Sequence, residues 1–87
     1  MRDNEAYRAQ LRALAISMQG TLPTERLDMV KEMIDANEGG EALITLAWTI
    51  VESGVMVPSS VIRELREQAD DLVAPGDLPA NLDAHGS

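Results

Sequence analysis

The residues best suited to chemistry are acidic side chains that recur at helical spacing between positions 25 and 35. Glu25, Asp28, Glu32 and Asp35 follow one another at intervals of three, four and three residues, so a helix would carry all four carboxylates on one side. Like charges at this spacing cost a helix about 0.2–0.5 kcal/mol per pair. This acidic stripe is therefore either a solvated face that aids solubility or a surface used by a cationic partner.

Catalysis would need other arrangements of reactive residues. A nucleophile with a base, a metal cluster or two carboxylates held in a cleft is the usual requirement. The sole histidine, His85, has no catalytic or metal-ligating neighbour at ligand spacing. Asp70 and Asp71 are adjacent, so they point apart on a helix. We expect no enzymatic activity, no cofactor and no metal site, although the sequence leaves open carboxylates that pair across two helices.

Two short segments match known ligand sites only in part. The run from Asp35 to Gly40 is similar to the start of a calcium-binding loop, but position five of that loop is Gly39, and position twelve, which needs a bidentate glutamate, is Leu46. Ser59 and Ser60 stand where an acidic carrier protein could hold pantetheine, but the Asp-Ser-Leu signature is absent. Both serines fit the first turn of a helix, and neither segment predicts a ligand.

The elements that must position these residues are helical. Strong helix formers such as Leu, Ala, Glu and Arg dominate the chain, which has one Tyr, one Trp and no Phe. Apolar residues recur every three or four positions in four stretches separated by Gly, Pro and Asn, over residues 4–19, 23–36, 41–53 and 58–73. We therefore predict an all-α fold, a compact four-helix bundle of two αα-hairpins.

The third and fourth stretches and the residues after them carry further expectations. Apolar residues cover more than half of the third helix, which should be the central and most buried one. The fourth should turn Leu65 and Leu72 inward. Residues 1–73 are predicted to be a helical domain. Residues 74–87 contain two prolines and two glycines without any period, and are predicted to be a flexible tail.

The charge of the chain restricts its partners. Fifteen acidic against seven basic residues give a net charge of −8, which repels nucleic acid and anionic membranes and favours encounter with a cationic protein. A second acidic group, formed by Glu64, Glu67 and Asp71, belongs to the fourth predicted helix. Cysteine is absent, the first residues lack an apolar signal core, and no apolar run is long enough to span a bilayer. We expect a cytoplasmic protein.

The sole tryptophan, Trp48, falls at the border of the apolar face of the third helix, beside Glu41 and Glu52. A half-exposed Trp among polar groups is a common interface anchor, and a Trp whose ring edge covers a core is equally common. Met29 and Ile16 lie off the main apolar stripe of their helices. They either extend an exposed apolar patch or cover a loop.

The stretch from Met33 to Leu72 resembles small bacterial immunity proteins of the Maf type and their relatives in contact-dependent and polymorphic toxin systems. The shared elements are a Glu-Gly turn, an Ala-Leu pair at the entry to the next helix, a Glu-x-Gly helix end, an apolar crossing and a final amphipathic helix. The resemblance implies a compact helical protein that binds and neutralises a cognate toxin domain, often a nuclease.

Charge and resemblance together predict a non-catalytic immunity protein, or antitoxin, that masks a basic site of a cognate bacterial toxin. The predicted partner-binding residues are Glu25, Asp28, Glu32, Asp35, Glu38, Glu41 and Trp48. The alternative is a helical interaction or regulatory module that homodimerises, or scaffolds a larger complex, through the apolar surface of the third helix. Salt separates the two hypotheses, because a charge-steered complex associates more slowly as ionic strength rises and an apolar dimer does not.

Overall fold

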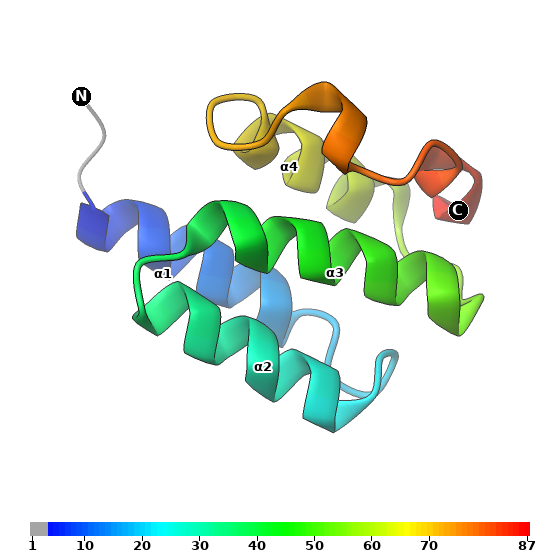
Figure 1. Ribbon diagram of the computed structural model, residues 1–87. Coiled ribbons are helices and arrows are strands. Elements are labelled where there is room, and N and C mark those ends of the chain that lie inside the picture. Colours follow the sequence, from blue (N-terminus) through cyan, green and yellow to red (C-terminus); the bar gives the residue numbers. More distant parts are fainter. Residues whose placement is uncertain (1–3) are drawn as a thin grey trace.

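The computed structural model describes residues 4–87, apart from the side chains of Asn4 and Pro75. Residues 1–3 of the predicted helical domain lie outside the described part. The predicted all-α bundle of four helices is confirmed (Figure 1). The elements are α1 (Asn4–Ile16), α2 (Thr24–Asp35), α3 (Gly39–Ser53), α4 (Ser59–Ala69) and two short 3-10 turns, η1 (Pro75–Asp77) and η2 (Leu82–His85).

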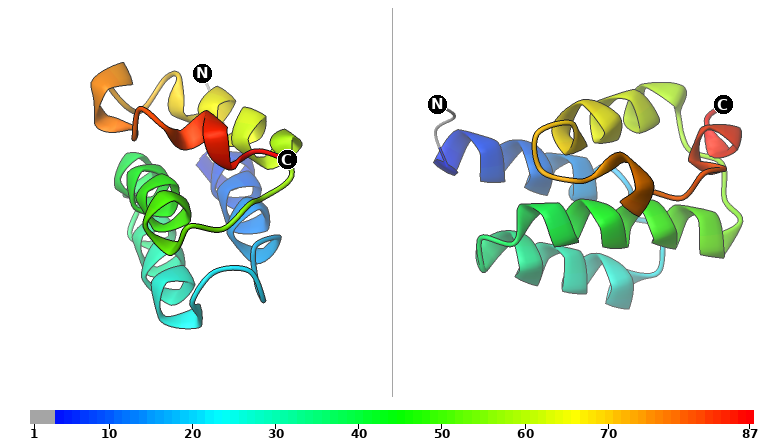
Figure 2. Two further views of the ribbon diagram at one scale, coloured as in Figure 1. Left: turned by 90° about the vertical axis from the view of Figure 1, so that its right-hand side faces the viewer. Right: turned by 45° about the horizontal axis from the view of Figure 1, so that its top comes forward.

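Each helix runs antiparallel to the one before it (Figure 1). Seen along their axes, α1, α2 and α3 form a triangle, and α4 lies across α1 and α3 (Figure 2). The most extensive contact between two helices is that of α2 with α3. Among residues 4–87, no helix combines the length and the apolar composition that a bilayer crossing requires.

Helix α3 is the central helix, as its broad apolar face predicts. Leu43, Leu46 and Ile50 are at most 2% exposed, and every other helix packs buried residues against them. Each fully buried Leu or Ile contributes about 1.5–3 kcal/mol relative to an exposed one. The residues that surround α3 include Leu11 and Leu14 of α1, Leu27 and Ile34 of α2, and Leu65 of α4.

Residues 74–87, named here the C-terminal segment, correct the prediction of a flexible tail. The segment runs along α3 beside α4 (Figure 2), and Leu82 is completely buried against both helices. The backbone of Val57 donates to the carbonyl of His85 and accepts from the amide of Ser87, both at 2.8 Å. No local period reveals this packing, because the segment is held by one buried apolar anchor and by backbone pairing with residues far away in the sequence.

The start of α3 and the end of α4 also differ from the predicted boundaries. Gly39 and Gly40 were expected to break the helical pattern, but α3 begins at Gly39, and Asn37, with φ of 65°, makes the turn instead. A Cβ atom at Gly40 would lie 3.0 Å from the carbonyl oxygen of Leu72, so this position permits a close approach of two backbones. Leu72, predicted to be buried, is 45% exposed because α4 already ends at Ala69.

Candidate functional site

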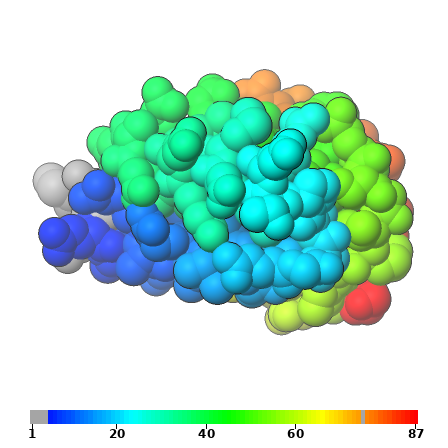
Figure 3. All heavy atoms as spheres, turned by 90° about the horizontal axis from the view of Figure 1, so that it is seen from below, coloured from blue at the N-terminus to red at the C-terminus, as the bar shows by residue number. Residues whose placement is uncertain are grey.

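The acidic stripe lies on the outer surface of α2. Leu27, Val30 and Ile34 are buried, and the four carboxylates of the stripe are exposed on the other side of the helix. The fold thus orients the stripe by burying the opposite apolar face. Figure 3 looks at this side of the molecule, where α2 (cyan to green) lies against α1 (blue).

Ion pairing within the chain reduces the acidic stripe from four free carboxylates to three. Asp35 forms an ion pair with Arg12 of α1, and both side chains are about half exposed. Such a pair contributes about 0–1 kcal/mol to stability, but it compensates the charge of Asp35. Within residues 4–87, Glu25, Asp28 and Glu32 have no ion pair with the chain's own basic groups. In this part of the chain they are exposed carboxylates without an ion pair, on a helix that also carries Arg26 and Lys31.

The remaining predicted residues occupy the turn after α2 and the exposed side of α3. Glu38 immediately precedes α3, and Glu41 lies in the first turn of that helix, where a negative charge is favoured by the helix dipole. All seven predicted residues are therefore exposed on the α2–α3 hairpin. The structure brings them to one hairpin, but Asp35 already has a partner in α1.

Trp48 also has a partner within the chain. Its side chain is 44% exposed, and its indole N–H donates a hydrogen bond of 3.2 Å to the backbone carbonyl of Asp77. The indole N–H is the only polar group of this side chain, so the remaining exposed surface of the ring is apolar. No pattern in the sequence indicates the contact with Asp77, because the C-terminal segment has no local period that would place it beside α3.

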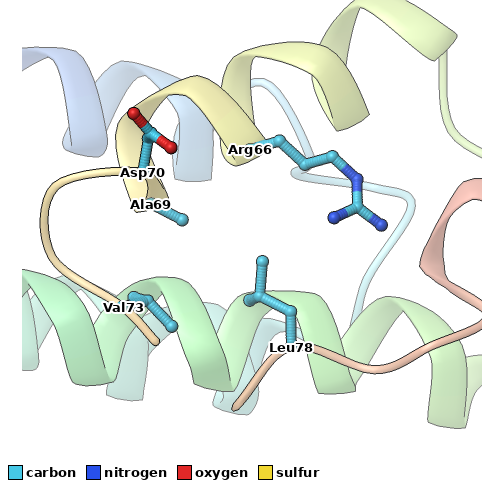
Figure 4. A pocket seen from close by; sticks show the side chains of 5 residues that line it. All are labelled: Arg66, Ala69, Asp70, Val73 and Leu78. Carbon is cyan, nitrogen blue, oxygen red and sulfur yellow. The ribbon is translucent and has the colours of Figure 1, made fainter. Parts of the chain in front are cut away.

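Glu64 and Glu67 of the second acidic group lie on α4, Asp71 lies just after this helix, and basic residues accompany them. Glu64 and Glu67 are exposed, and Arg66 of the same helix donates from Nε to Asp83 of the C-terminal segment at 2.7 Å. Below Arg66 lies a shallow pocket of about 280 Å³, lined also by Ala69, Asp70, Val73 and Leu78 (Figure 4). The side chains of Arg66 and Asp70 point in different directions there, so they do not converge on one ligand atom.

The histidine of the chain, His85, contacts the backbone of the segment between α3 and α4. No group of three or more His, Cys, Asp or Glu side chains within residues 4–87 could hold a metal ion. The Nδ1 atom of His85 lies 2.8 Å from the carbonyl oxygen of Val55. A carbonyl only accepts, so Nδ1 carries the proton and His85 helps to hold the C-terminal segment in place.

Comparison with known proteins provides no relative from which a function could be transferred. The chain matches no protein-family model, no curated protein and no solved structure. The resemblance to immunity proteins therefore stays a prediction.

Proposed function

We propose that this protein is an immunity protein, which binds a cognate bacterial toxin domain and neutralises it by covering a basic site with the acidic stripe of α2. The observation that carries the proposal is the exposure of Glu25, Asp28 and Glu32 without a basic partner among residues 4–87. The protein acts in the cytoplasm by binding and not by catalysis. Its partner is a basic protein, in agreement with the net charge of −8.

A nuclease is the toxin class that fits this surface best. Its active site is cationic in order to hold phosphates, and the carboxylates of the stripe rise by about 4.5 and 6 Å along the helix axis from one to the next. One strand of nucleic acid presents a phosphate about every 3.4 Å of axial rise. The carboxylates are spaced more widely than this axial rise, but both rows place negative charges a few ångströms apart, so the stripe can occupy such a site as a mimic of the phosphate backbone.

The test is a charge reversal on α2 with a matched reversal on α4. The Asp28→Lys, Glu32→Lys double variant should lose most of its affinity for the toxin domain encoded beside this gene, because close charge pairs across an interface couple by about 1.5–7 kcal/mol. The control is the Glu64→Lys, Glu67→Lys variant, which changes the net charge equally on the other acidic helix. Isothermal titration calorimetry and protection of the toxin's substrate are the measurements.

The two variants separate specific binding from a general charge effect. A loss confined to the α2 variant supports the proposal. Equal losses in both variants would mean that net charge matters and the α2 stripe does not, and unchanged affinity in the α2 variant would remove this face from the interface.

The alternative of a homodimer formed through α3 has little surface available. Most apolar residues of α3 are covered by the other helices and by Leu82, and Trp48 is the large apolar side chain of this helix that stays exposed. Sedimentation of the protein alone at low and high salt measures self-association directly. A dimer that persists or strengthens at high salt would favour the alternative.

A further inference from the structure

The face formed by α2 and α3 carries two large exposed apolar side chains, Met29 and Trp48, each 44% exposed. The hydroxyl of Thr45 lies 3.5 Å from the sulfur of Met33 and marks where the two helices meet. Met29 lies one turn before Met33, and Trp48 lies one turn after Thr45. Because the helices are antiparallel (Figure 1), both steps lead toward the same end of the hairpin. The two apolar side chains are therefore level with each other on either side of this seam.

Carboxylates surround the apolar pair along both helices. Glu25 and Glu32 flank Met29 at one turn on either side, which is the distance at which helical side chains are neighbours. Glu41 and Glu52 lie on the exposed side of α3, before and after the tryptophan. Within the described chain, none of these four carboxylates forms an ion pair with a basic group. Arg26 also lies one turn before Met29 and is exposed, so the border of the apolar pair holds four carboxylates and this one arginine on α2 and is negative in sum.

The C-terminal segment fixes the orientation of the aromatic ring. The hydrogen bond from the indole of Trp48 to the carbonyl of Asp77 satisfies the only polar group of the side chain. A partner that covers the ring therefore leaves no buried donor unsatisfied. Because the ring is already ordered, binding also costs less side-chain entropy than it would for a free side chain.

We propose that Met29 and Trp48 form the centre of the partner-binding surface, and that this surface binds a protein segment that carries both lysine or arginine and apolar side chains. Charge complementarity selects this occupant. A cationic side chain gains from the face of the Trp48 ring and from the carboxylates around it, and an apolar side chain packs on Met29. The inference rests on the proposed function. The acidic surface by itself mainly speeds the encounter with the partner, and the apolar anchors add binding contacts beside it.

The test uses NMR signals that report directly on the two anchors. The chain has one Trp, so the indole N–H signal belongs to Trp48, and the methyl signal of Met29 can be assigned with a Met29→Ala variant. The probe is an amphipathic peptide of lysine and leucine. Its two controls replace every leucine by serine or every lysine by glutamate. The lysine–leucine peptide should shift both anchor signals in a saturable, salt-sensitive manner, and neither control should do so.

A matched pair of methionine variants measures the contribution of the anchor. Met29→Ala should weaken binding of the lysine–leucine peptide about fivefold to thirtyfold, the effect of one to two kcal/mol that is typical of an interface anchor. Met56→Ala removes a methionine that is 54% exposed between α3 and α4, outside this face, and should leave the affinity unchanged.

The outcomes distinguish failure of this inference from failure of the proposed function. If lysine peptides shift the backbone amides of Asp28 and Glu32 but leave both anchor signals in place, the acidic stripe binds alone and the apolar anchors are wrong. Equal effects of Met29→Ala and Met56→Ala would also overturn the inference, as would the absence of any shift. Toxin binding by the charge-reversal variants decides the proposed function independently of these results.

Discussion

Replacing Leu82 with alanine should lower the free energy of unfolding by about 3–4 kcal/mol. Leu82 is 0% exposed and is the buried apolar anchor of the C-terminal segment between α3 and α4. The substitution removes three carbon groups, each worth about 0.8 kcal/mol when buried, so transfer alone costs about 2.4 kcal/mol. The remainder is the cost of the cavity, since the helices on either side can close over it only in part.

The predicted loss is large for a chain of this size. A stability of about 0.05–0.15 kcal/mol per residue corresponds to about 4–13 kcal/mol in total for this chain. Urea denaturation followed by far-UV circular dichroism measures the global transition. The fluorescence of Trp48 reports the unfolding of the C-terminal segment in the same samples, because the indole N–H is hydrogen-bonded to the backbone carbonyl of Asp77. Both probes should report a lower midpoint in the Leu82→Ala variant.

The matched control is Leu72→Ala, the same substitution at a residue that is 45% exposed just after α4. It should cost less than about 1 kcal/mol, because little buried surface is lost. A Leu82→Ala variant that unfolds at the same urea concentration as the Leu72→Ala variant would refute the reasoning. The C-terminal segment would then be a flexible tail in solution, and Trp48 would lack its fixed orientation.

The remaining predictions concern backbone contact and charge. Gly40→Ala should lower the thermal midpoint by an amount equivalent to about 1–3 kcal/mol, because the new Cβ would lie 3.0 Å from a backbone oxygen. The control Gly76→Ala should be neutral, since no atom lies within 4 Å of its Cβ. Equal thermal midpoints of the two variants would contradict this prediction. Glu32→Lys should raise the free energy of unfolding in urea by about 0.5 kcal/mol, because it replaces repulsion between like charges on α2 by attraction between opposite charges. The same variant should bind the partner more weakly. A loss of stability would show that the carboxylates of the stripe do not repel one another. Arg12→Ala should cost less than about 1 kcal/mol, since its ion pair with Asp35 is exposed, and a larger loss in low-salt urea denaturation would show that the pair is structural.

Local patterns in the sequence determined which face of each helix is buried. The recurrence of apolar residues over residues 23–36 predicted one buried face, and Leu27, Val30 and Ile34 form the buried side of α2. The same periodicity oriented the acidic stripe, because residues that share a spacing of three or four share a face whatever lies against it. The breadth of the apolar face of α3 likewise predicted its central position.

Helix boundaries depended on contacts that the local pattern does not contain. Gly39 and Gly40 were expected to break the helical pattern, but they are the first residues of α3, and Gly40 permits the close approach of the backbone at Leu72. Leu72 continued the apolar period of α4, yet the helix ends earlier and leaves the side chain exposed. A period shows which residues could be buried, and the packing of the neighbouring elements decides how far the helix continues.

For the candidate site, the sequence by itself determined the residue types, their helical faces and their exposure, because these follow from local spacing and charge. Only the tertiary structure decided that Asp35 is compensated by Arg12 and that the C-terminal segment holds Trp48 through Asp77. Both contacts join residues from elements far apart in the chain. Their formation depends on how the helices pack as rigid bodies, and a single sequence carries no periodic signal for such pairings.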